Sequence, residues 1–100
     1  MPELLKVGVT DEIPEGEGKA YTAGKHKVAI FNVGGSFYAI NDACPHAGGP
    51  LSDGWMEGME VTCPWHGWTF DVRPDAPPTD GLCRYKVQVN GNELFVEIPD

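Results

Sequence analysis

A chain of 100 residues is long enough for one small domain and too short for a second hydrophobic core. Its 15 Asp and Glu against 7 Lys and Arg give a formal net charge of −8, which argues against nucleic-acid binding because phosphates are bound by basic surfaces. An acidic surface of this kind suits docking on a basic protein as well as it serves solubility.

The N-terminus and the cysteine count point to the inside of the cell. Residues 1–16 lack the basic segment and apolar stretch of a secretory signal, and no run approaches the roughly 18 apolar residues of a membrane helix. Three Cys, an odd number, do not form a disulfide framework in an apparently unexported chain. We therefore expect a cytoplasmic protein, not inserted in a membrane, whose Cys serve metal binding or catalysis.

The first half of the chain predicts strands. Residues 4–9 and 19–24 are apolar or β-branched segments separated by a turn, and the second reads as an edge strand. Residues 26–33 and 36–41 flank a Gly-Gly pair, which is a strong hairpin signal. No segment predicts a helix of three turns.

The second half contains an irregular region and another hairpin. Residues 43–81 are rich in Gly, Pro, Trp, Cys and His, and only 59–63 and 69–72 look like strands. Residues 85–89 and 93–98 flank an Asn-Gly-Asn turn. The expected fold class is all-β: one domain over residues 1–100, with a small antiparallel β-sandwich base and an inserted ligand-bearing lobe at about 43–81.

Two pairs of metal-ligating residue types lie in this lobe. Cys44 and His46 form a C-x-H pair, Cys63 and His66 form a C-x-x-H pair, and sixteen residues separate His46 from Cys63. Zinc fingers usually place Cys with Cys and His with His. A mixed pair on each of two loops instead suits a binuclear centre, because each loop can give sulfur to one metal and nitrogen to the other.

The stretch "CPHAGGPL…CPWHGWTFDV" resembles the cluster-binding signature of Rieske proteins. In Rieske centres two His replace two Cys on one iron of a [2Fe–2S] cluster. The resemblance implies a Rieske fold holding one such cluster, with Cys44 and Cys63 on one iron and His46 and His66 on the other. Two thiolates leave the cluster less negative than four, so it accepts an electron at a higher potential than plant-type ferredoxins do.

Four positions depart from the high-potential Rieske proteins. Those proteins carry a disulfide between two further Cys, where this chain has Gly49 and Trp65. They also have Ser and Tyr hydroxyls bonded to cluster sulfurs, where this chain has Trp68 and Phe70. Loss of donors to sulfur disfavours the reduced, more negative cluster. We therefore expect a low-potential Rieske ferredoxin, near the bottom of the range at about −150 mV.

One Cys and one His remain outside the motif. Cys83 shares the phase of the strand at 85–89, so we expect a small buried core residue. His26 opens a strand and is expected to be exposed. Rieske oxygenase subunits need a second iron site with two His and a carboxylate, which a single remaining His cannot build. The expected protein is an electron carrier and not an enzyme.

Three functions stay open. The resemblance implies first a soluble ferredoxin that passes electrons from a flavin-dependent reductase to a terminal oxygenase. The alternative is the Rieske-type small subunit of an assimilatory nitrite reductase, acting with its large subunit. Several members of that group lack cluster ligands, whereas this chain keeps all four. The third is a zinc-stapled interaction module, which would lack the colour of an iron–sulfur cluster.

Overall fold

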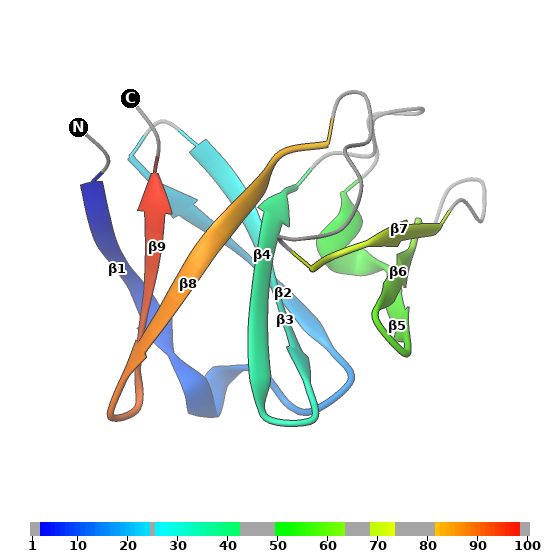
Figure 1. Cartoon of the computed structure of the whole chain (residues 1–100), viewed down its shortest axis with the longest axis horizontal. Helices are drawn as coiled ribbons and strands as arrows, with labels where there is room; N and C mark the ends of the chain where they lie inside the picture. Colours follow the sequence, from blue (N-terminus) through cyan, green and yellow to red (C-terminus); the bar gives the residue numbers. More distant parts are fainter. Residues whose placement is uncertain (1–2, 25, 43–49, 64–68, 74–81, 99–100) are drawn as a thin grey trace.

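The protein is described by a computed structural model over residues 3–24, 26–42, 50–63, 69–73 and 82–98 (Figure 1). None of the helices in these ranges is long and apolar enough to cross a membrane. The elements are, in chain order, β1 (Glu3–Val9), the 3-10 helix η1 (Thr10–Glu12), β2 (Gly18–Ala23), β3 (His26–Val33), β4 (Ser36–Asn41), the 3-10 helix η2 (Leu51–Asp53), β5 (Trp55–Glu57), β6 (Glu60–Thr62), β7 (Thr69–Asp71), β8 (Arg84–Asn90) and β9 (Glu93–Ile98).

The strands form two antiparallel sheets. Six of them follow the order β1-β9-β8-β4-β3-β2, and the other three form a small sheet in the order β5-β6-β7. Strands β4 and β8 pair only at Ala39–Tyr85 and Ile40–Arg84, where β8 crosses the molecule diagonally (Figure 1). The two halves of the six-stranded sheet therefore share one apolar core, to which β3, β4, β8 and β9 all contribute.

Strand β3 is buried on both faces. Val28 and Ile30 face the core between the halves of the six-stranded sheet, which we call the base core. Ala29 and Phe31 point the other way, into a second cluster shared with the small sheet, which we call the lobe core. Because side chains alternate along a strand, a continuous apolar run fills both layers at once. β3 therefore joins the base to the lobe.

The structure confirms an all-β, antiparallel sandwich base with an inserted lobe. The predicted strands at 26–33, 36–41 and 93–98 coincide with β3, β4 and β9, and β2 lies at a sheet edge as expected. Three elements were not predicted: η1, η2 and β5. Each contains three residues, too few for a periodic pattern to be visible. Strands β6 and β7 are as short, but they lie within the longer segments predicted as strands at 59–63 and 69–72.

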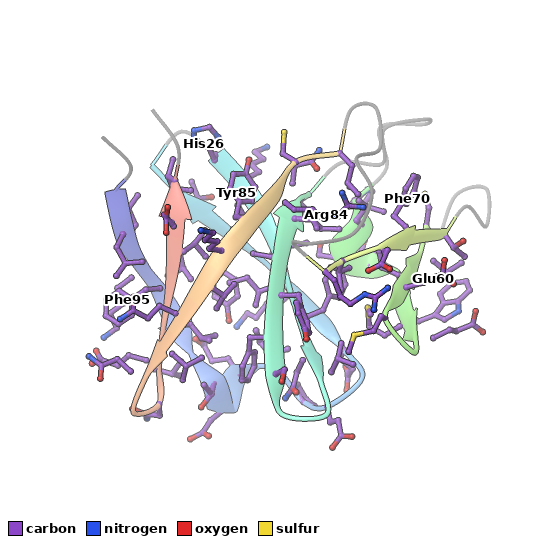
Figure 2. All side chains as sticks on the ribbon, viewed as in Figure 1. His26, Glu60, Phe70, Arg84, Tyr85 and Phe95 are labelled. Atoms are coloured by element: carbon purple, nitrogen blue, oxygen red, sulfur yellow. The ribbon has the colours of Figure 1, made fainter. Side chains whose placement is uncertain are left out.

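The predictions for Cys83 and His26 were wrong. Cys83 is exposed because it precedes β8, and the buried residue beside it is Leu82. His26 does open β3, but it is partly buried, with its Nδ1 3.5 Å from the hydroxyl of Tyr85 (Figure 2). The prediction for Cys83 was wrong because the inside–outside alternation of β8 was extended to a residue that lies before the strand begins at Arg84.

Candidate metal centre

Cys63 is the one predicted ligand that the structure describes. Cys44, His46 and His66 lie outside the described residues, as do Gly49, Trp65 and Trp68. Cys63 directly follows β6, is fully buried in the lobe core and is a free thiol. Its neighbours in that cluster include Leu51 and Phe70. A buried, unpaired sulfur is the type of donor that iron–sulfur clusters use.

Strands β6 and β7 hold both ends of the segment that carries Cys63 and His66. Thr62 pairs with Thr69, and Val61 pairs with Phe70. Neighbouring strands lie about 5 Å apart, so the chain leaves β6 beside the point at which it enters β7. The Val61 and Phe70 side chains face inward and are buried, which fixes this pairing to the lobe core.

Asp42 holds both ends of the segment that carries Cys44 and His46. Its carboxylate accepts a hydrogen bond from the Ser52 backbone N–H at 2.8 Å and another from the Ser52 hydroxyl at 3.1 Å. Asp42 follows β4 and Ser52 belongs to η2, so these bonds join the chain before the segment to the chain after it. Bonds to an ionised carboxylate are stronger than neutral ones, which makes this closure firm.

Gly54 brings the two ligand-bearing segments together. A Cβ placed on Gly54 would lie 2.0 Å from the Thr62 carbonyl oxygen and 3.1 Å from that of Leu51. Any side chain would therefore collide with the backbone immediately before Cys63. Glycine at this position lets the exit of the first segment pack directly on the entry to the second.

The residues that flank a third segment, 74–81, are bonded to β4 and β7. The Asn41 N–H donates to the Cys83 carbonyl at 3.0 Å, and the Cys83 N–H donates to Asn41 Oδ1 at 2.8 Å. On the other side, Arg84 Nε donates to the Asp71 carbonyl at 2.8 Å. The residues that flank the first and third segments are thus bonded to each other through β4, β7 and the start of β8.

Asp71 also forms an ion pair with Arg73. Its carboxylate accepts hydrogen bonds from the Arg73 guanidinium, with Nη2–Oδ2 at 2.7 Å, and these hold the pKa of Asp71 below its usual value. The pair lies where the chain leaves β7. It is exposed on the Arg73 side, so its net effect on stability is small.

The described part of the site fits a cluster held by two loops, because it presents a buried thiol and two segments whose ends are closed and packed together. No group of three or more Cys, His, Asp or Glu is placed to hold a metal within the ranges given above. Sequence reasoning did not identify Asp42, Ser52 and Gly54. Their only signal was a polar residue after a strand and a glycine between short elements, which is common in turns.

The sequence matches the Rieske [2Fe-2S] domain family over residues 3–91. A curated relative, the 3-phenylpropionate/cinnamic acid dioxygenase ferredoxin subunit of Escherichia coli strain K12, is 38% identical over 94 residues, which cover 89% of this chain and 88% of the relative. These matches extend well beyond the two Cys/His pairs.

Solved structures give the same result. The ferredoxin of carbazole 1,9a-dioxygenase from Nocardioides aromaticivorans IC177 superposes with a TM-score of 0.85 at 30% identity, over 96% of this chain and 98% of that one. A chain in a complex of reduced oxygenase and oxidized ferredoxin in carbazole 1,9a-dioxygenase superposes with a TM-score of 0.79 at 30% identity, over 94% and 92%.

A nitrite reductase protein shares the fold. The putative NADH-dependent nitrite reductase small subunit from Mycobacterium tuberculosis superposes with a TM-score of 0.86, over 100% of this chain and 98% of that one. At 19% identity, this likeness concerns the architecture alone.

Proposed function

The chain belongs to the Rieske [2Fe–2S] family, and we propose that it is a soluble, cytoplasmic one-electron carrier that takes electrons from a flavin-dependent reductase and passes them to a terminal oxygenase. The observation that carries this proposal is the likeness to free-standing dioxygenase ferredoxins over nearly the whole length of both chains, at 30% identity or more. The solved complex of an oxygenase with its ferredoxin adds support for the oxygenase as acceptor.

Within this proposal, Cys44 and Cys63 bind one iron and His46 and His66 bind the other. A bound Rieske cluster accepts and returns a single electron. The chain's own contribution is to position the ligands. Asp42 and the β6–β7 pairing hold the ends of the two ligand-bearing segments, and the lobe core keeps water from the Cys63 sulfur. The whole chain acts as one domain.

Four observations favour the carrier over the alternatives. The nitrite reductase small subunit is similar in fold, but the dioxygenase ferredoxins are closer in sequence, and this chain keeps all four ligands. A zinc module has no need of mixed Cys/His pairs. With one His outside the motif, the chain also lacks the ligands for a second, catalytic iron.

Purification under anaerobic conditions tests the cofactor. We expect about two irons and two acid-labile sulfides per chain, a red-brown colour, and in the reduced protein the EPR spectrum of a cluster with mixed nitrogen and sulfur ligands. Stoichiometric zinc without visible absorbance would overturn the proposal. Substitution for the ferredoxin subunit in the E. coli 3-phenylpropionate/cinnamic acid dioxygenase system then tests the carrier role, with substrate-dependent oxygen uptake as the measurement.

A further inference from the structure

The small sheet has one face packed on the lobe core and one face that is exposed except at Thr62 and, in part, at Asp71. Met56, Val61 and Phe70 form a cross-strand row that faces the lobe core. The rows on either side point the opposite way, because side chains alternate along each strand. We call this opposite side the outer face of the small sheet; it consists of Trp55, Thr62 and Thr69 in one row and Glu57, Glu60 and Asp71 in the other.

Three carboxylates meet in one row of this face. Glu57 pairs directly with Glu60, and Glu60 pairs directly with Asp71. Like charges directly opposite each other destabilise a sheet. Arg73 compensates Asp71, but within the described part of the chain neither Glu57 nor Glu60 forms an ion pair. Both are exposed, and Glu60 lies on the side of the molecule away from β1 and β9 (Figure 2).

The neighbouring row presents an aromatic ring and an unpartnered hydroxyl. Trp55 is 50% exposed although it lies on a strand, and is one of three large apolar side chains in the described ranges that are exposed to this degree. Beside it, Thr62 is only 5% exposed, and its Oγ1 has no hydrogen-bond partner. A buried hydroxyl without a partner is costly, but the Oγ1 is covered, so in this row the Trp55 ring is what a partner protein can reach.

These features match one kind of partner. Arg and Lys stack on an exposed indole and pair with carboxylates at the same time, and Trp is the best ring for this contact. Along the chain the face also adjoins a proposed cluster ligand, since Thr62 directly precedes Cys63.

We propose that the outer face of the small sheet is the surface on which a basic, electron-accepting protein docks, with an Arg or Lys of that protein over the Trp55 indole and beside the Glu57 and Glu60 carboxylates. This rests on the proposed function as an electron carrier. Docking is followed by transfer of one electron, which oxidises the ferredoxin and reduces the acceptor without breaking a covalent bond. The charges speed the encounter, and Trp55 prolongs the contact.

The test uses the cluster-loaded protein and cytochrome c, a basic one-electron acceptor. The ferredoxin is reduced, and the second-order rate constant for cytochrome c reduction is measured by anaerobic stopped flow at low and high ionic strength. The test variant is Glu57→Gln/Glu60→Gln. The matched control is Asp11→Asn/Glu15→Gln, which removes the same charge from the exposed segment between β1 and β2. Visible spectra and midpoint potentials establish that each variant keeps an unaltered cluster.

At low salt we expect the Glu57→Gln/Glu60→Gln rate to fall about tenfold and the control rate by less than about twofold, with the difference vanishing at high salt. Trp55→Ala should lower the rate about threefold at both salt concentrations. Equal losses in the test variant and the control would mean that net charge alone matters, and would overturn the inference. Unchanged transfer in the test variant would overturn it as well, with the carrier function intact. A wild-type protein without a cluster would instead overturn the proposed function itself.

Discussion

The six-stranded sheet and the small sheet differ in how far each can be stable without the rest of the molecule. Strands of the former contain six to eight residues, and its two halves bury a core between them. Every strand of the small sheet has three residues, and its inner face is buried in a core to which β3, β4 and η2 contribute (Figure 1). Sheets so short are not stable by themselves. The base is therefore a scaffold, and the lobe depends on the base and on the metal it binds.

The largest expected effect separates the two free cysteines that the structure describes. Cys63→Ser should abolish the cluster, because it removes a buried sulfur ligand, and should leave the six-stranded sheet folded. Cys83→Ser should keep the cluster, since that side chain is exposed. Iron and sulfide analysis together with far-UV circular dichroism checks both. A fully loaded Cys63→Ser protein would remove this residue from the ligand set.

A matched pair of core truncations should distinguish the two regions. Leu94 in the base core and Leu51 in the lobe core are both fully buried, so Leu94→Ala and Leu51→Ala should each cost about 2–5 kcal/mol. In urea, Leu94→Ala should shift the loss of strand signal and of cluster absorbance together. Leu51→Ala should release the cluster at a lower urea concentration than that at which the strand signal is lost. If both variants shift both signals equally, base and lobe unfold as one unit.

Two glycines of the lobe give a smaller, purely steric comparison. Gly54→Ala should destabilise the protein by about 3 kcal/mol and weaken cluster retention, because the added methyl meets the Thr62 carbonyl. Gly58→Ala should cost about 1 kcal/mol through its positive φ of 63° alone, since no atom lies near its added methyl. Thermal unfolding and the rate of cluster bleaching are the measurements. Equal behaviour would show that the Gly54 contact does not hold the two segments together.

The smallest effect concerns the reduction potential. Phe70 is buried in the same cluster as Cys63, and Phe70→Tyr offers a hydroxyl to the site. We expect the potential to rise by about 30 mV, or roughly 0.7 kcal/mol for one electron, because a donor to sulfur stabilises the reduced cluster. Phe37→Tyr adds the same hydroxyl to the base and should leave the potential unchanged. Protein-film voltammetry measures the midpoint potentials of the wild type and both variants. A wild-type potential above roughly +100 mV would contradict the interpretation as a low-potential ferredoxin.

The sequence by itself determined the fold class, the hairpins and the identity of the candidate ligands. Hairpins such as β3–β4 are local, so their strand periodicity and turn glycines are visible in a short window. The ligand motif is likewise read from residue type and spacing. Cys83 shows the limit of this reasoning. It lies just before the first residue of β8, so the alternation of residue types in that strand does not determine whether its side chain is buried.

Only the tertiary structure decided how the lobe is held and which of its faces is open. The Asp42–Ser52 closure, the Gly54–Thr62 contact and the Asn41–Cys83 pair join residues between eight and 42 positions apart, and none has a periodic signal. The outer face arises in the same way. Nothing in the sequence around them distinguishes Glu57, Glu60 and Asp71 from other acidic residues. The register of three short strands places their charges in one row beside Trp55. Register depends on which face the core buries, and that is a property of the assembled layers.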